Sequence, residues 1–142
     1  MPDARIHRAA AADLPVLTRL WQTAFGDPPE LIGAFYHRFP PQAAAWVVEV
    51  NGTVVTAAHL LGGRLHTADG TTLPCAYVYA ASTDPAQQGH GYASALMRRF
   101  AAEADANGCV LYTLPAEASL YAWYQSVMGT TQTARGTRLR IA

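Results

Sequence analysis

The stretch Tyr79-Ala-Ala-Ser-Thr-Asp-Pro-Ala-Gln-Gln-Gly-His-Gly-Tyr-Ala-Ser94 decides the fold. Its first residues end a strand expected over 73–83, and its last residues open a helix expected over 91–106. Gly89 and Gly91 lie in the loop between them, where a backbone without Cβ can approach a ligand closely. Because a helix N-terminus presents free N–H groups and a positive dipole end, the loop is typical of a phosphate or pyrophosphate site. A tight turn without a ligand is the alternative interpretation.

Apolar periodicity and turn residues divide the rest of the chain. The expected elements are strands at 5–8, 46–50, 53–66, 73–83, 109–114 (buried) and 135–141, and helices at 14–25, 28–39, 91–106 and 118–128. Asn51-Gly52 is a strong hairpin signal between two of these strands. The order β-α-α-β-β-β-α-β-α-β predicts an α/β (α+β) fold with a mixed, mostly antiparallel central sheet flanked by helices. One domain over residues 1–142 accounts for the whole length.

Composition excludes several classes of function. Hydrophobic residues make up 51% of the chain and charged residues 14%, which is typical of a globular protein. Ten basic residues, all of them Arg, balance ten acidic ones, so we expect no nucleic-acid and no membrane partner. The absence of Lys excludes Walker A and Schiff-base chemistry. The two Cys and five His show no metal-ligand spacing, so we expect no metal, and the lack of a signal or apolar span predicts a cytoplasmic protein.

Gln88-Gly89-His90-Gly91-Tyr92-Ala93 matches the pattern Gln/Arg-x-x-Gly-x-Gly/Ala, the pyrophosphate loop of the GNAT superfamily of N-acetyltransferases. The chain resembles that family over nearly its whole length. Trp46-Val-Val-Glu-Val-Asn-Gly-Thr-Val-Val55 is similar to the family's first hairpin, and Leu114-Pro-Ala-Glu-Ala-Ser-Leu-Tyr-Ala-Trp-Tyr124 to its last helix. The segments 77–83 and 114–117 look most like the bacterial branch that includes the Eis-type, aminoglycoside-acetylating proteins.

The resemblance implies an acetyl-CoA-dependent N-acetyltransferase, in which a small-molecule or peptide amine attacks the thioester directly in a ternary complex. Strand backbone would pair with the pantetheine arm of acetyl-CoA, and loop amides would hold its pyrophosphate. The implied cofactor-binding residues are Ala81, Ser82, Thr83, Gln88, Gly89, His90, Gly91, Tyr92, Ala93 and Ser94. Glu117 stands where relatives often have an Asn that touches the cofactor. The acceptor pocket would come from residues 21–39.

A catalytic acid is implied on the last helix, where the family has a Tyr that protonates the departing thiolate. Tyr124 matches it best, although Gly129 follows five residues later instead of four. Tyr121, one turn earlier, is the reserve candidate, and a simple packing face is the alternative. The strand 73–83 contains no carboxylate, which leaves Glu49 and His59 as the nearest bases. We therefore expect a water-relayed proton instead of a side-chain base.

Two other functions are compatible with the same residues. A non-catalytic acyl-CoA-binding module would explain the irregular Tyr124 context and the missing base. A phosphate-binding or nucleotide-binding regulator of another fold would explain only the Gly-rich loop. The sequence is also compatible with a homodimer.

Overall fold

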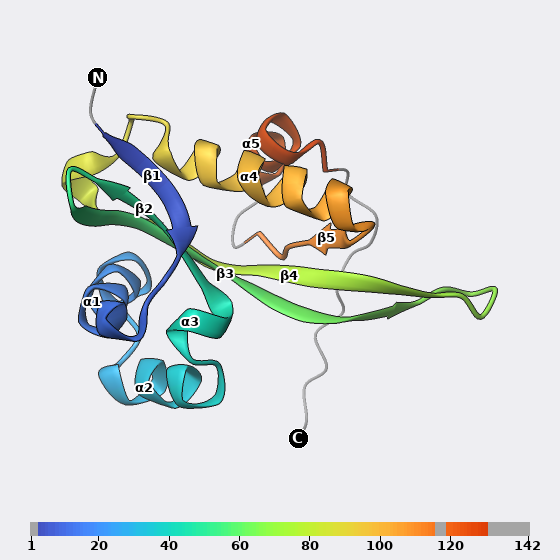
Figure 1. Ribbon diagram of the computed structural model, residues 1–142, viewed down its shortest axis with the longest axis horizontal. Coiled ribbons are helices and arrows are strands. Elements are labelled where there is room, and N and C mark those ends of the chain that lie inside the picture. The colour runs from blue at the N-terminus through green and yellow to red at the C-terminus, as the bar shows by residue number, and fades with distance from the viewer. Residues whose placement is uncertain (1–2, 116–118, 131–142) are drawn as a thin grey trace.

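The computed structural model describes residues 3–115 and 119–130. Figure 1 shows its elements in chain order. They are β1 (Ala4–Arg8), a 3-10 turn (Ala11–Asp13), α1 (Leu14–Phe25), α2 (Pro29–Arg38), α3 (Pro41–Ala44), β2 (Ala45–Val50), β3 (Thr53–His66), β4 (Thr72–Thr83), a 3-10 turn (Pro85–Gln87), α4 (Tyr92–Asn107), β5 (Val110–Tyr112) and α5 (Leu120–Met128). The strand predicted at 135–141 lies outside the described residues.

The strands form one sheet in the order β1-β2-β3-β4-β5. The first four pair antiparallel with their neighbours, and β5 joins β4 in parallel after the crossover through α4. The predicted mixed, mostly antiparallel sheet flanked by helices is therefore confirmed. The one-turn helix α3 was not predicted. It begins at Pro41 because Pro is well tolerated at the first helical position, where its missing N–H has no helical partner anyway.

Each face of the sheet has its own core, because successive strand residues point to opposite faces. Val47 and Ala57 pack with α1 and α2 on one face. Their neighbours Val48 and Ala58 pack with α4 and α5 on the other. Figure 1 shows the two helical layers on either side of the sheet. None of the described helices is long and apolar enough to cross a membrane.

The strand predicted as buried at 109–114 is shorter and more exposed than expected. β5 covers only Val110–Tyr112, and Val110, Tyr112 and Leu114 are all exposed. Among the described residues, β5 pairs only with β4, which makes it the edge of the sheet. An apolar run alone does not distinguish an edge strand from a central one, which is why the sequence misled here.

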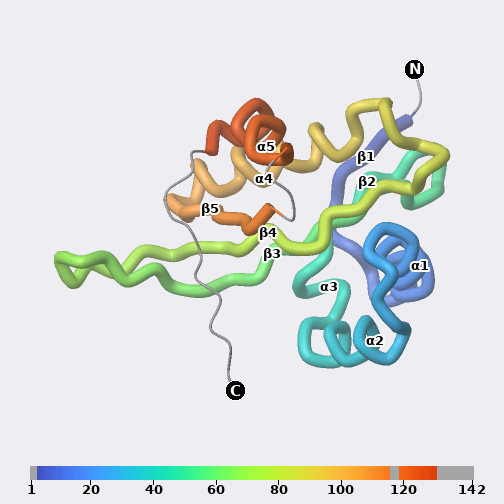
Figure 2. Tube along the Cα trace, turned by 180° about the vertical axis from the view of Figure 1, so that it is seen from behind, coloured from blue at the N-terminus to red at the C-terminus, as the bar shows by residue number. Residues whose placement is uncertain are grey.

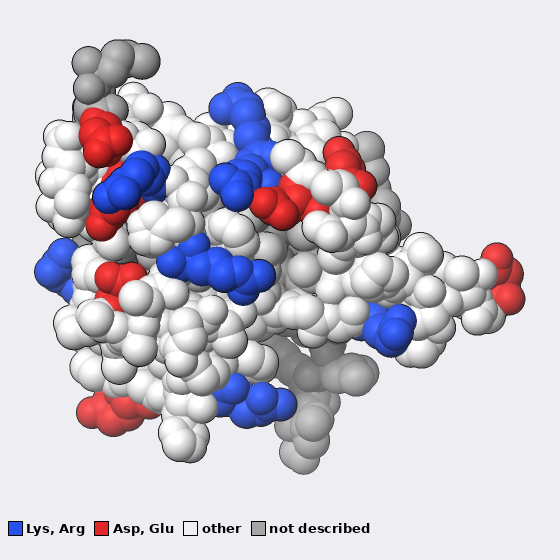
Figure 3. All heavy atoms as spheres, in the orientation of Figure 1, with Lys and Arg blue, Asp and Glu red and all other residues white. Residues whose placement is uncertain are grey.

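The far end of the β3–β4 hairpin extends away from the body, as Figures 1 and 2 show. We call residues 62–74 the β3–β4 arm. β2 pairs with β3 no farther than His59, and β5 meets β4 only from Cys75 onward. The arm is consequently a two-stranded ribbon in which nearly every residue is exposed. Figure 3 shows basic and acidic side chains interspersed on one face of the molecule, in keeping with the zero net charge.

His59 is buried beneath α2 and makes two hydrogen bonds. Its Nδ1 lies 3.1 Å from the Tyr79 carbonyl, and its Nε2 lies 2.7 Å from the Tyr36 hydroxyl. A carbonyl only accepts, so Nδ1 carries the proton and Nε2 accepts from Tyr36. Burial lowers the pKa of His59 to about 4, against a smaller opposing effect of its backbone hydrogen bonds. The ring is therefore neutral near pH 7, and its lone pair is occupied.

Replacing Tyr36 with Phe removes the donor to His59 Nε2 and leaves a buried acceptor unpaired. We expect the free energy of unfolding to fall by about 1–3 kcal/mol in urea titrations. Tyr112→Phe is the matched control, because Tyr112 is exposed, and it should change stability by less than about 0.5 kcal/mol. Equal stability of the Tyr36→Phe variant and the wild type would contradict this hydrogen bond.

The low pKa of His59 also predicts how stability depends on pH. The unfolded chain takes up a proton at His59 below about pH 6.5, whereas the folded protein does so only near pH 4. The contribution of neutral His59 to the free energy of unfolding is complete above pH 6.5. It declines by up to about 3 kcal/mol as the pH falls towards 4. Urea titrations from pH 7.5 to 4.5 measure it. The His59→Gln variant should lose this part of the slope, and an unchanged slope in that variant would exclude His59 as its source.

Candidate functional site

The middle of the sheet opens at a bulge in β4. The pairing of β3 with β4 shifts by one residue between Ala57↔Ser82 and His59↔Tyr79. The extra residue lies at Ala80, whose φ of +49° is unusual for a residue with a side chain. On its other edge β4 pairs with β5 only over Cys75–Tyr77. Among the described residues, no strand therefore covers this edge of β4 from 78 to 83.

A groove of about 800 Å³ runs from this open edge to the start of α4. We call it the long groove. Nine of the ten predicted cofactor residues line it, together with the end of α1 and part of α5. They are Ala81, Ser82, Thr83, Gln88, Gly89, Gly91, Tyr92, Ala93 and Ser94. Gly89 and Gly91 have φ values of +83° and +81°, which glycine adopts without strain. The loop so formed directs the first turn of α4 at the groove.

His90 is the predicted residue whose side chain does not reach the long groove. Its Nδ1 lies 3.0 Å from the Gln87 carbonyl, and its ring stacks on Tyr92 at 5.6 Å between centroids. It lines a separate hollow with Val50 and Asn51. Alternating loop residues point to different sides, so the match to the loop pattern alone could not assign its side chain a direction.

The long groove has no charged side chain among its described lining residues. Binding of an anion there would depend on the N–H groups of the first turn of α4, which have no carbonyl one turn earlier to pair with. Gln88 donates from Nε2 to the Thr83 carbonyl at 3.5 Å, a long contact that ties the loop to the end of β4. Backbone amides and the helix dipole together suit a phosphate group.

A smaller cavity of about 220 Å³ adjoins the long groove, and we call it the side cavity. The two spaces share Phe25, Ala81, Leu120 and Tyr124. Tyr124 therefore stands at their junction. Tyr121, the reserve candidate, is exposed and lines neither space. Of the two candidate acids, Tyr124 alone lines both spaces.

Burial raises the pKa of Tyr124 above its ordinary value, and a hydrogen bond with the Thr113 side chain acts in the opposite direction. Thr113 in turn donates from Oγ1 to the Val78 carbonyl at 3.0 Å. Tyr124 is half-buried and packs edge-on against Trp123, with ring centroids 4.8 Å apart. A positioned, neutral phenol of this kind can donate a proton to a developing anion.

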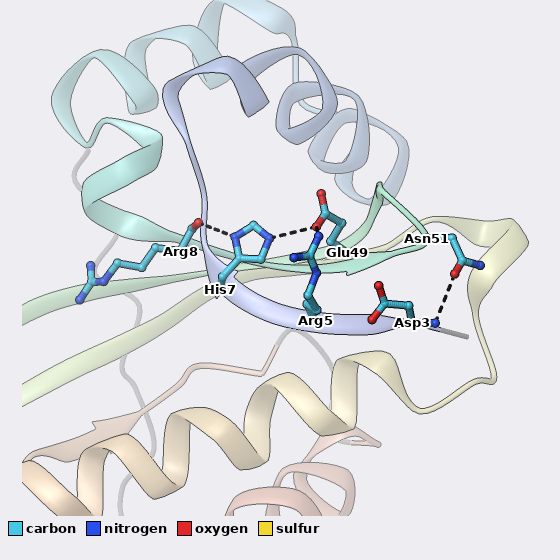
Figure 4. Close-up of polar contacts among 6 residues, drawn as sticks. All are labelled: Asp3, Arg5, His7, Arg8, Glu49 and Asn51. Atoms are coloured by element: carbon cyan, nitrogen blue, oxygen red, sulfur yellow. Dashed lines mark hydrogen bonds and ion pairs between the residues drawn. The ribbon is translucent and has the colours of Figure 1, made fainter. Parts of the chain in front are cut away.

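Neither candidate base lines the long groove or the side cavity. Glu49 lies on β2, where Oε2 accepts from Arg5 Nη2 at 2.9 Å and lies 3.5 Å from His7 Nε2. Figure 4 shows this cluster across β1 and β2. His59 is enclosed beneath α2 with both ring nitrogens hydrogen-bonded. Glu117 lies outside the described residues.

Sequence reasoning missed Asp27, the one charged side chain among the described residues that line the side cavity. The sequence Asp27-Pro28-Pro29 predicts the start of a helix, and α2 does begin at Pro29. Asp27 itself, however, lines the cavity, and its carboxylate accepts from Trp21 Nε1 at 2.8 Å. No group of three or more His, Cys, Asp or Glu among the described residues has the arrangement of a metal site.

Comparison with known families and structures gives a consistent result. The family of acetyltransferase (GNAT) domains matches residues 5–127. A putative acetyltransferase from Agrobacterium tumefaciens is 26% identical, with a TM-score of 0.77 over 96% of this chain and 99% of its own. Comparison with curated protein sequences gives no match.

Two structures at lower identity share the fold. An aminoglycoside N-acetyltransferase solved in complex with CoA is 14% identical, with a TM-score of 0.79 over 99% of this chain and 96% of its own. A predicted acetyltransferase from Clostridium acetobutylicum, solved with acetyl-CoA, is 17% identical, with a TM-score of 0.75 over 99% and 96% of the two chains. At these identities the likeness concerns the fold alone.

Placing a negative charge in the long groove tests whether it binds an anion. Ala93→Glu introduces a carboxylate on the first turn of α4, where an acidic residue favours the helix itself. We expect CoA affinity, measured by calorimetry, to fall by more than about tenfold through repulsion of the phosphates. Ala102→Glu on the exposed side of the same helix is the control and should bind CoA normally. Normal affinity of Ala93→Glu would exclude the groove as the phosphate site.

Proposed function

This chain belongs to the GNAT acetyltransferase family, and from that premise we propose that it transfers an acetyl group from acetyl-CoA directly to a primary amine. Transfer of acetyl from acetyl-CoA is the activity that family membership supports in general; the amine acceptor and the direct attack are our proposal. The observation that carries it is the position of Tyr124, at the junction between a long groove and a side cavity. One space accommodates the acyl donor and the other the acceptor.

The long groove fits CoA in both of its parts. The open edge of β4 at Ala81, Ser82 and Thr83 offers backbone groups to the amides of the pantetheine arm, in the manner of an added strand. The first turn of α4 offers amides to the pyrophosphate. Recognition through backbone groups explains why the groove needs no Arg among its described lining residues.

The proposed reaction is a single displacement. The neutral amine attacks the thioester carbonyl carbon, the new C–N bond forms, and the C–S bond breaks. The leaving thiolate takes the Tyr124 proton, the nitrogen loses its extra proton to water, and water returns a proton to the Tyr124 phenolate. Tyr124 is suited to this role because a phenol keeps its proton at neutral pH and can donate it to a developing thiolate. Holding both reactants at one junction supplies the remaining catalysis through proximity.

A non-catalytic acyl-CoA-binding module is the second candidate. It is favoured by the positions of Glu49 and His59, since neither lines the reaction space. The same observation is compatible with catalysis if water relays the proton. Turnover with any amine would exclude the binding module.

The proposal predicts acetylation of amines from labelled acetyl-CoA and a specific loss in Tyr124→Phe. We expect this variant to lower kcat by roughly 10²–10⁴ in a mass-spectrometric transfer assay, because water must replace the positioned phenol. CoA affinity should stay close to that of the wild type, since the ring still packs against Trp123.

Tyr121→Phe is the matched control and should retain full turnover, because Tyr121 is exposed and lines neither space. The opposite pattern, with loss only in Tyr121→Phe, would show that α5 presents Tyr121 to the thioester. Wild-type turnover in both variants would show that no tyrosine of this helix donates the proton.

A further inference from the structure

The side cavity has an unusual lining for a site that must receive a polar substrate. Its walls are mostly aromatic or aliphatic, with Trp21, Phe25, Tyr77, Tyr79 and Leu120 prominent among them. Its volume of about 220 Å³ equals that of about seven water molecules in the liquid. A space of this size and character fits a small molecule with an apolar body.

One charge is built into this apolar wall. Asp27 is partly buried, and its Oδ2 accepts from the indole Nε1 of Trp21 at 2.8 Å. Among the described residues, no hydrogen-bond donor reaches its Oδ1. No Arg or His lies among the described lining residues, so Asp27 is the one charged side chain that they present. One carboxylate oxygen is thus left to pair with a ligand.

The aromatic rings around Asp27 also favour a cation. Trp21 packs edge-on against Tyr79, with ring centroids 5.6 Å apart, and Tyr79 lies 5.5 Å from Tyr77. These contacts fix the rings, and aromatic faces attract an ammonium through their negative quadrupole. Trp21 is itself buried, so the residue that orients the carboxylate is held firmly by the core.

We propose that the acceptor is a small primary amine with an apolar or aromatic body and no negative charge, and that Asp27 binds its ammonium group. This inference rests on the proposed acetyl transfer and specifies its substrate. An acceptor that carries a carboxylate or phosphate would bury that group beside Asp27, without a basic partner among the described lining residues. A polyhydroxylated amine would leave most of its hydroxyls against apolar walls.

Asp27 attracts and orients the acceptor, and it is distinct from the groups that break the thioester. The bound ammonium gives its proton to water before the nitrogen attacks. The loss of Asp27 should therefore raise the KM for the amine more than it lowers kcat. The KM for acetyl-CoA should not change, because Asp27 lines only the side cavity.

A matched set of amines tests the substrate class. 2-Phenylethylamine carries an ammonium on an aromatic body, phenylalanine adds a carboxylate to it, and glucosamine replaces the body with hydroxyls. We expect kcat/KM for 2-phenylethylamine to exceed that of either other amine by at least about 100-fold. Higher kcat/KM for phenylalanine or glucosamine would overturn the assigned substrate class and leave acetyl transfer itself standing.

Asp27→Asn tests the anchor. The Asn side-chain oxygen can still accept from Trp21 Nε1, so the variant keeps this hydrogen bond and loses only the negative charge. The KM for 2-phenylethylamine should rise about 10- to 100-fold, the loss expected for a charge-assisted hydrogen bond. Glu30→Gln removes the same charge from the exposed first turn of α2, outside the cavity, and is the control. An equal rise in both variants would assign the effect to overall charge and overturn the anchor.

Equilibrium binding separates failure of this inference from failure of acetyl transfer. Calorimetry measures 2-phenylethylamine binding to the wild type and to Asp27→Asn, each saturated with CoA. Binding that weakens in Asp27→Asn, without acetylation of any amine, would support the anchor and reject the proposed function. Acetylation of other amines with no measurable binding of 2-phenylethylamine would reject the anchor alone.

Discussion

The hydrogen bond from His59 Nδ1 to the Tyr79 carbonyl holds β4 where it bulges, and the site depends on that bulge. A residue such as Ala80, with positive φ, costs about 1–3 kcal/mol and persists only where its surroundings enforce it. The Tyr36 hydroxyl fixes the His59 ring from the other side. The neutral, buried imidazole of His59 thus connects α2, which carries Tyr36, to β4 at its bulge. Its burial explains why it cannot also act as a base.

In the groove that we propose for CoA, the groups offered to the ligand come largely from the backbone, at the open edge of β4 and the first turn of α4. Side chains contribute shape at Ala81, Ala93 and Ser94, and no charge comes from the described lining residues. Such a groove tolerates sequence change, because any residue with the right backbone angles supplies the same amides. The side cavity differs in this respect, because its described lining presents specific side chains, namely Asp27 and its aromatic neighbours.

Local signals in the sequence predicted the meander, the loop and the helix that follows it, because Gly89 and Gly91 and the apolar stripe of α4 are short-range features. The sequence did not predict features that depend on distant partners. The exposure of β5 follows from its edge position, and the placement of the Asp27 carboxylate follows from the position of Trp21 in the fold. The direction of His90 depends on how the loop turns. The roles of the loop residues and of Tyr124 stay predictions that the geometry supports.

The β3–β4 arm has a consequence for how copies of this protein meet one another. A two-stranded ribbon whose edges are covered by no other strand of the described residues is a template for pairing with strands of other molecules. Pro74 has no N–H to offer such a strand, and the charge of Arg64, its partner in the ribbon, opposes the approach of an identical arm. Gly62 and Gly63 give the ribbon little side-chain surface to bury. The arm can therefore project into solvent, because these residues disfavour strand pairing between the arms of two molecules.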